Sequence, residues 1–248
     1  MRRGMTGWLF AVVLCSFLPL SHAWGKTSER TLASVEKKFR ATFPSTPVEA
    51  VKESEIADLF EIYAGARIIY YAPKQNMVVF GELYSANGIS LTQQKLDAQA
   101  QKRIEHIDKT VALSVGEGPT ELIAFVDPDC PHCKHAYNWL AEQKFQGVKE
   151  LIYFMPMKGR PAAEARAVQA ICAPPELRAE ALRQVFNPDP NTSGHPLQCP
   201  QAAEALRAQA KIAEEVGVSG TPFFFVKGQA ITGFDRERLA ALLTEHKE

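Results

Sequence analysis

The sequence lacks an excess of either charge, since its 248 residues contain 28 Lys and Arg residues against 28 Asp and Glu residues. That balance argues against nucleic acid or an anionic membrane as a partner. The basic residues are dispersed along the chain and form no patch. Internal repeats and low-complexity tracts are also missing, which argues against a repeat architecture. The hydrophobic fraction of 46% is ordinary for a globular protein, and the length suits one large domain or two small ones.

Hydrophobic runs long enough to cross a membrane are lacking as well. The most apolar stretch, Trp8–Leu18, is shorter than the ~20 residues that a membrane-spanning helix needs. It follows Arg2 and Arg3 and precedes a small-residue cleavage site, which is the pattern of a secretory signal peptide. We therefore expect residues 1–23 to be a signal peptide, cleaved near Ala23, and the protein to reach the periplasm. A retained membrane anchor is the alternative.

Cysteine is scarce, with five in the chain, and Cys15 lies inside the expected signal peptide. The mature chain would keep Cys130, Cys133, Cys172 and Cys199. An even number of cysteines in an exported protein allows two disulfides.

The strongest motif is Cys130-Pro131-His132-Cys133, which follows an apolar run rich in β-forming residues and precedes a helical stretch. A strand that delivers C-x-x-C to the start of a helix is typical of the thioredoxin fold. The positive end of a helix stabilises a thiolate, so we expect Cys130 to be nucleophilic near neutral pH. Cys133, one turn further on, is placed to attack a mixed disulfide formed at Cys130.

Residues next to the two cysteines are expected to influence the start of the helix and the reactivity of Cys130. Pro131 suits the first helical turn, where its missing N–H costs nothing. His132 is expected to stabilise the Cys130 thiolate and to make the disulfide more oxidising, although an exposed helical residue is the plainer interpretation. Asp129 is expected to cap the helix rather than to act as a catalytic acid, and its carboxylate would oppose thiolate formation.

Metal binding is the alternative for C-x-x-C, particularly with His132 and His135 close by. No second pair of ligands at zinc-finger spacing accompanies the motif, because the remaining cysteines are distant and single. Redox chemistry is therefore favoured, and we expect neither a metal nor a cofactor.

Two further pairs of residues complete the candidate site. Thr221-Pro222 precedes a predicted strand and indicates a turn. A cis peptide there would bring the Thr221 backbone beside Cys130, where it could pair with an extended substrate segment. Cys172 and Cys199 flank a Pro-rich loop, and a structural disulfide is favoured over a second redox pair because neither cysteine begins a helix within a C-x-x-C motif.

Hydrophobic periodicity predicts two domains joined by a helix. Residues 24–89 form an α+β domain, which at roughly sixty residues is marginal alone and is expected to pair with a second copy of itself. A capping box at Ser90 opens a linker helix that is expected to occupy residues 90–115. Residues 116–248 follow the strand-helix-strand order of an α/β thioredoxin fold, with a helical insertion at about 159–216. The strands expected in the first domain are Val48–Val51, Leu59–Tyr63, Arg67–Tyr71 and Met77–Leu83.

The stretch Phe125–Cys133, with Gly220-Thr221-Pro222 downstream, resembles the DsbC/DsbG family of periplasmic disulfide isomerases. Segments from Glu53 to Tyr71, then Gly81-Glu82-Leu83 and Leu91-Thr92, are similar to that family's N-terminal dimerisation domain. The resemblance implies a V-shaped homodimer in which two thioredoxin domains face an apolar cleft. Its expected partners are misfolded exported proteins with wrong disulfides and a membrane reductase of the DsbD type.

The resemblance also assigns the site residues. It implies that Cys130 is the attacking and Cys133 the resolving cysteine, that the Thr221–Pro222 peptide is cis, and that Cys172–Cys199 is a structural disulfide. One departure concerns the direction of catalysis, because Pro131-His132 is the pair found in the DsbA oxidants. We therefore expect an isomerase with chaperone activity, and keep a dithiol oxidase and a non-catalytic chaperone as alternatives.

Overall fold

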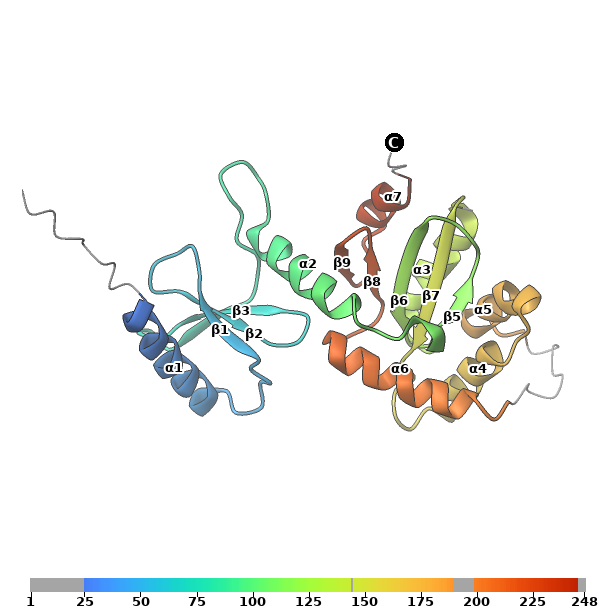
Figure 1. Ribbon diagram of the computed structural model, residues 1–248, viewed down its shortest axis with the longest axis horizontal. Coiled ribbons are helices and arrows are strands. Elements are labelled where there is room, and N and C mark those ends of the chain that lie inside the picture. The colour runs from blue at the N-terminus through green and yellow to red at the C-terminus, as the bar shows by residue number, and fades with distance from the viewer. Residues whose placement is uncertain (1–24, 144, 190–198, 245–248) are drawn as a thin grey trace, which may run out of the picture.

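The computed structural model describes residues 25–143, 145–189 and 199–244, and contains a four-stranded and a five-stranded sheet. Figure 1 shows the two sheets on opposite sides of the central helix α2, Leu91–Ile104. The expected signal peptide lies outside the described residues, as do residues 190–198 and 245–248. Within these ranges no helix combines the length and the hydrophobicity that a membrane span needs.

The N-terminal sheet is antiparallel, with the strand order β1-β2-β3-β4. Its two central strands are buried on both faces. On one face Phe39 of the N-terminal helix packs against Ile62 and Tyr71, and on the other Tyr63 and Tyr70 meet the linker helix. The elements are helix α1 (Gly25–Thr42) and strands β1 (Ala50–Glu53), β2 (Phe60–Tyr63), β3 (Ile68–Ala72) and β4 (Met77–Val79).

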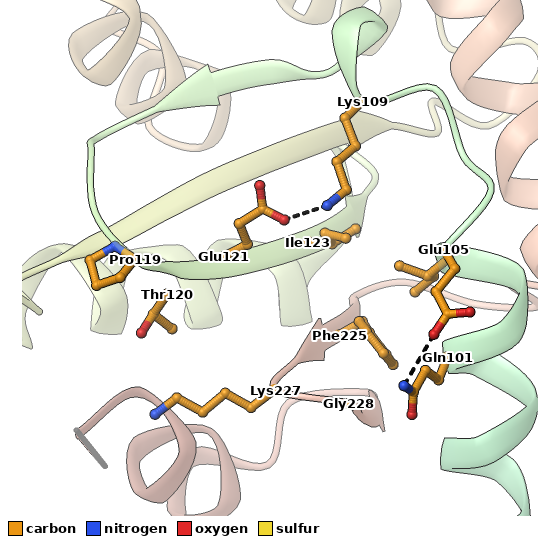
Figure 2. Close-up of a pocket in the computed structure, with 11 residues that line it drawn as sticks. Gln101, Glu105, Lys109, Pro119, Thr120, Glu121, Ile123, Phe225, Lys227 and Gly228 are labelled. Carbon is orange, nitrogen blue, oxygen red and sulfur yellow. Dashed lines mark hydrogen bonds and ion pairs between the residues drawn. The ribbon is translucent and has the colours of Figure 1, made fainter. Parts of the chain in front are cut away.

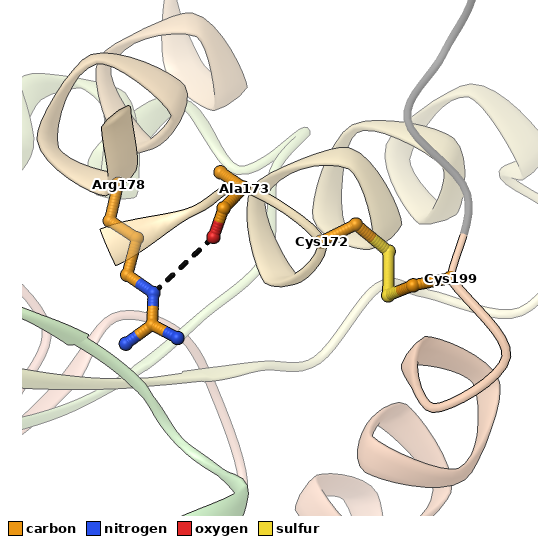
Figure 3. Close-up of a disulfide and its surroundings, with 4 residues drawn as sticks. All are labelled: Cys172, Ala173, Arg178 and Cys199. Atoms are coloured by element: carbon orange, nitrogen blue, oxygen red, sulfur yellow. Dashed lines mark hydrogen bonds between the residues drawn. A yellow bond between two sulfur atoms is a disulfide. The ribbon is translucent and has the colours of Figure 1, made fainter. Parts of the chain in front are cut away.

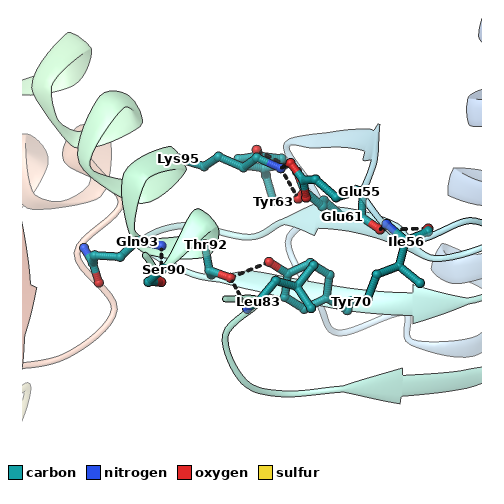
Figure 4. A network of polar contacts seen from close by, with 11 residues as sticks. Glu55, Ile56, Glu61, Tyr63, Tyr70, Leu83, Ser90, Thr92, Gln93 and Lys95 are labelled. Atoms are coloured by element: carbon teal, nitrogen blue, oxygen red, sulfur yellow. Dashed lines mark hydrogen bonds and ion pairs between the residues drawn. The ribbon is translucent and has the colours of Figure 1, made fainter. Parts of the chain in front are cut away.

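Helix α2 is tied to this sheet by a network of polar contacts, of which Glu61, Tyr70 and Thr92 are the buried members (Figure 4). The Lys95 ammonium lies 2.5 Å from the buried carboxylate of Glu61 and 2.7 Å from that of Glu55. One turn earlier, the Thr92 hydroxyl accepts a hydrogen bond from the Leu83 N–H at 2.8 Å. The expected cap is present, because the Ser90 hydroxyl accepts the N–H of Gln93 at 3.0 Å.

The linker helix is shorter than the sequence predicts, and the expectation that it fills residues 90–115 is wrong. It ends at Ile104, and a 3-10 turn, Lys109–Val111, and strand β5, Leu113–Val115, follow. Apolar residues beyond Ile104 keep a helical spacing, but Ile107 and Val111 pack against the core of the second sheet instead. Strand β5 then pairs with β7 of that sheet.

The second sheet has the order β5-β7-β6-β8-β9, in which β6 and β7 are parallel and β8 and β9 are antiparallel to their neighbours. Side chains of β6 alternate between two cores, with Leu122 and Ala124 on the face of helix α3 and Ile123 and Phe125 on the other. The bounds are β6 (Thr120–Val126), α3 (Pro131–Gln143), β7 (Val148–Phe154), β8 (Phe223–Val226), β9 (Gln229–Thr232) and α7 (Arg236–Thr244).

A helical insertion lies between β7 and β8, as predicted from the sequence. The helices are α4 (Pro161–Ile171), α5 (Arg178–Phe186) and α6 (Ala202–Val216), with a 3-10 turn, Pro175–Leu177, ahead of α5. A disulfide joins Cys172, at the end of α4, to Cys199, just ahead of α6 (Figure 3). It closes a loop with a sequence separation of 27 residues, for which chain entropy gives roughly 3–4 kcal/mol.

Candidate functional site

The turn between β6 and α3 is organised by Asp127, a buried residue whose role no sequence motif indicates. One carboxylate oxygen accepts the N–H of Asp129 at 2.8 Å, and the other accepts the N–H of Met157 at 3.2 Å. The Asp127 carbonyl accepts the N–H of Cys130 at 3.0 Å. These bonds hold the loop from both sides and fix where α3 begins.

Cys130 directly precedes the first residue of α3, Pro131, and its carbonyl accepts the N–H of Lys134 at 3.1 Å. Its sulfur therefore lies at the end of the helix where backbone N–H groups have no partner within the helix. The prediction that Asp129 caps this helix is wrong. The Asp129 carboxylate turns instead to an arginine of the insertion, Arg166.

The two thiols of the motif differ sharply in exposure. Cys130 is half-buried and reaches the surface, whereas the Cys133 side chain is 0% exposed. Burial, followed by weaker contributions from the neighbouring Cys130 thiol, raises the pKa of Cys133 well above its usual value, although backbone hydrogen bonding at Asp127 opposes the shift. An external disulfide can therefore reach Cys130 but not Cys133.

Thr221 arrives beside Cys130 because of the sheet register. Strand β8 runs antiparallel to β6, with Phe223 opposite Phe125, so the residues just before β8 lie next to the end of β6. The Cys130 thiol donates a hydrogen bond to the Thr221 carbonyl at 3.3 Å. The Thr221–Pro222 peptide bond is cis.

Other predicted site residues lie on the first turn of α3. Pro131 occupies the first helical position, and His132 is exposed on the surface of the same turn. The expected effect of His132 on the Cys130 thiolate stays a prediction. In the ranges that the structure describes, no group of three or more His, Cys, Asp or Glu side chains is placed to hold a metal ion.

A separate hollow of about 610 Å³ lies where α2, the start of β6 and the β8–β9 turn meet (Figure 2). Two of its charged side chains, Lys109 and Glu121, form an ion pair with each other in the wall. It borders Thr120 and Ile123 at the beginning of β6, whereas Cys130 follows the end of that strand. The hollow therefore does not contribute to the cysteine site.

Residues 26–93 match the family described as the disulfide bond isomerase protein N-terminal domain. The chain is also 25% identical over 219 residues to the probable thiol:disulfide interchange protein DsbC of Bordetella parapertussis, covering 85% of this chain and 73% of that protein. The Bordetella pertussis protein of the same description is 24% identical over the same shares. The family match covers the N-terminal domain, and the chain over most of its length is similar to these relatives, which supports the DsbC/DsbG-type thiol:disulfide interchange family.

Solved structures agree with this family on the fold. The Proteus mirabilis ScsC linker-deletion mutant superposes with a TM-score of 0.52 at 17% identity, over 60% of this chain and 83% of that one. Alpha-DsbA2 of Wolbachia pipientis gives 0.51 at 15% identity, over 60% of this chain and 94% of that one. The predicted fold class is confirmed: an α+β N-terminal domain, a linker helix and a thioredoxin-like domain with a helical insertion. The similarity to thiol:disulfide interchange proteins supports thiol-disulfide oxidoreductase activity for this chain.

Proposed function

We propose that the chain is a periplasmic protein disulfide isomerase in which Cys130 is the attacking thiolate and Cys133 the resolving thiol. The observation that carries this proposal is the contrast between the two sulfurs: one reaches the surface at the start of a helix, and the other is wholly buried behind it. A helix N-terminus stabilises a thiolate on the exposed sulfur. The buried thiol stays protonated until a mixed disulfide brings an electrophilic sulfur to it.

The reaction conserves electrons. The Cys130 thiolate attacks one sulfur of a wrong substrate disulfide, forming a mixed disulfide and releasing the other substrate sulfur as a thiolate. A different substrate thiolate then attacks the mixed disulfide, so a new substrate disulfide forms and Cys130 leaves as a thiolate. If none arrives, Cys133 loses its proton and attacks Cys130, which releases a reduced substrate and leaves the Cys130–Cys133 disulfide. A membrane reductase of the DsbD type would then return that pair to thiols.

The backbone at Thr221 is the proposed docking point for the substrate chain. Its carbonyl lies within hydrogen-bond distance of the attacking sulfur, so an extended segment paired there would present its disulfide to Cys130. Main-chain pairing of this kind is indifferent to sequence, which suits an enzyme acting on many misfolded exported proteins with wrong disulfides. It also supports the proposed chaperone activity.

We further propose that the protein is a homodimer joined through its N-terminal sheet. Strand β4 is at the edge of that sheet, and its open side is a template for pairing with another chain. The exposed large apolar side chains in and after β4 are Met77, Val79, Phe80, Tyr84 and Ile89. Covering them with a second copy would place two Cys130 sites on one molecule.

The test is the reshuffling of a scrambled protein with several disulfides in a glutathione buffer. Cys130→Ala is expected to abolish the reshuffling. Cys133→Ala is expected to retain part of it, because substrate thiols can resolve the mixed disulfide in place of Cys133. Full reshuffling by Cys130→Ala would overturn the proposal.

A dithiol oxidase is the second candidate, favoured by Pro131-His132 between the cysteines. Trapping the thiols in intact cells with an alkylating tag separates the two functions. An isomerase is expected to hold Cys130 and Cys133 mostly reduced, and a mostly oxidised pair would assign the oxidase function instead.

A further inference from the structure

The residue before the attacking cysteine carries a negative charge that the proposed chemistry must counter. Asp129 is adjacent to Cys130, and its side chain is 30% exposed, so water screens it only in part. A carboxylate near a thiol disfavours the thiolate form of that thiol. Left alone, Asp129 would therefore weaken the nucleophile.

Two arginines that are separated in sequence from the motif converge on Asp129. The Arg166 guanidinium, on α4, forms an ion pair with one oxygen of the Asp129 carboxylate. Arg160, just ahead of α4, places a guanidinium nitrogen 3.6 Å from the other oxygen. Both come from the helical insertion, so the motif itself gives no sign of them.

Arg166 is held in place by more than the carboxylate. Its Nε donates to the Val185 carbonyl of α5 at 3.0 Å, and its Nη2 donates to the Pro128 carbonyl at 3.3 Å. The side chain is 22% exposed. One guanidinium thus joins α4, α5 and the loop that carries Cys130, in the fixed fork geometry that a lysine does not have.

We propose that Arg166, assisted by Arg160, is a positioning residue that neutralises Asp129 and thereby sets how strongly the Cys130–Cys133 pair oxidises other thiols. The inference rests on the proposed function, because it assumes that this pair undergoes thiol-disulfide exchange. In the relevant equilibrium two glutathione thiols supply two electrons and two protons, the Cys130–Cys133 bond breaks, and glutathione disulfide forms. Only the reduced side of this equilibrium contains a thiolate that the local charge acts on.

Each substitution is expected to change the oxidising strength of the Cys130–Cys133 pair in a direction set by the charge that it removes. Arg166→Met leaves Asp129 partly uncompensated, which disfavours the Cys130 thiolate and makes the pair less oxidising. Asp129→Asn removes the opposing charge and leaves the positive charge of Arg166 uncompensated on the loop that carries Cys130, which makes the pair more oxidising. The double variant removes both charges and returns the equilibrium towards wild type.

The experiment measures the equilibrium constant of each full-length protein with reduced and oxidised glutathione. Each single substitution is expected to shift the constant about three- to tenfold, in opposite directions, as for the loss of one unit charge in a partly screened site. A tenfold shift corresponds to about 30 mV in the potential of a two-electron couple. The equilibrium constant of the double variant is expected to lie within about twofold of the wild-type value. Arg166→Lys is expected to change the constant less than Arg166→Met does, because lysine keeps the positive charge.

A purely structural role for Arg166 predicts a different pattern. Loss of its carbonyl contacts would disturb the loop in Arg166→Met and Arg166→Lys alike, and Asp129→Asn would not restore the double variant. Shifts in the same direction, or none, would overturn the inference. The matched control is Arg183→Met, which removes an exposed arginine paired with Glu180 on the same insertion and is expected to leave the constant unchanged.

The glutathione measurement distinguishes a wrong proposed function from a wrong role for Arg166. If the wild-type pair does not equilibrate with glutathione at all, the proposed function is wrong. If the wild-type pair equilibrates but the Arg166 and Asp129 variants have the same equilibrium constant, only the proposed role of Arg166 is wrong.

Discussion

The sulfur of Cys130 lies 3.3 Å from the carbonyl oxygen of Thr221, although 91 residues separate them in the chain. The antiparallel register of β6 and β8 creates this contact. It brings the exposed sulfur and the proposed substrate-docking backbone together, while Cys133 stays buried behind them.

Alkylation rates are expected to report this asymmetry. In the reduced protein at neutral pH, iodoacetamide should modify Cys133 at least about tenfold more slowly than Cys130, because Cys133 is buried and its pKa is raised. Peptide mass spectrometry after timed quenching measures both rates. Equal rates in the folded protein would contradict the assigned order of the two cysteines.

The network around Glu61 is expected to contribute strongly to stability. Lys95→Met would leave the Glu61 carboxylate, 1% exposed, without its cation, at a cost of about 3–5 kcal/mol in the free energy of unfolding. Urea denaturation measures the loss. The matched control, Lys74→Met, breaks an exposed pair with Asp58 and is expected to cost under ~1 kcal/mol. Similar losses of unfolding free energy in both variants would show that the Lys95–Glu61 pair contributes no more to stability than an exposed ion pair.

Glu150 is expected to make stability fall as the pH rises. Its Oε2 and the Tyr137 hydroxyl are buried without a hydrogen-bond partner among the described residues, and both residues border a cavity of about 200 Å³. Burial raises the pKa of Glu150 from 4.5 to about 7, so the folded protein keeps a proton that the unfolded chain has released. The contribution of Glu150 to the free energy of unfolding is therefore fully present below about pH 4.5. It is lost between about pH 4.5 and pH 7, by roughly 3 kcal/mol in total.

The comparison with Glu150→Gln tests that decline. The variant cannot ionise, so the difference between its unfolding free energy and that of wild type should grow from pH 4.5 to 7 and stay constant above that. A difference that is independent of pH would show that Glu150 titrates normally.

The edge of the N-terminal sheet is expected to control the oligomeric state. Val79→Lys places a charge on edge strand β4, whose Val79 side chain is 52% exposed, and should convert a dimer to monomers. Sedimentation equilibrium measures the mass. Leu177→Lys, which alters an equally exposed apolar residue of the helical insertion, should leave the mass unchanged. A wild-type monomer, or a dimer that persists in Val79→Lys, would rule out this interface.

Local patterns were sufficient to predict the order of elements. The C-x-x-C motif after an apolar strand and the capping box at Ser90 are short-range signals, and the structure contains α3 and α2 where they indicate. The spacing does not predict the end of α2, because Ile107 and Val111 have helical spacing but are partly buried against the core of the second sheet. Tertiary packing overrides a periodic pattern in such cases.

The surroundings of Cys130 were less predictable, because they are made by distant residues. Arg160 and Arg166, which look dispersed in the sequence, both reach Asp129 from the helical insertion. The same contact explains why Asp129 does not cap α3. In the sequence Asp127 is only an aspartate before a proline, and its burial and hydrogen bonds in the fold show that it organises the loop.

The most direct test of the account is to trap the intermediate itself. Cys133→Ala, mixed with a scrambled disulfide protein and quenched with acid, should accumulate a mixed disulfide whose protein sulfur is that of Cys130. Mass mapping identifies the linkage, and Cys130→Ala should form none. A mixed disulfide through any other cysteine, or none in Cys133→Ala, would contradict the claim that Cys130 is the nucleophile.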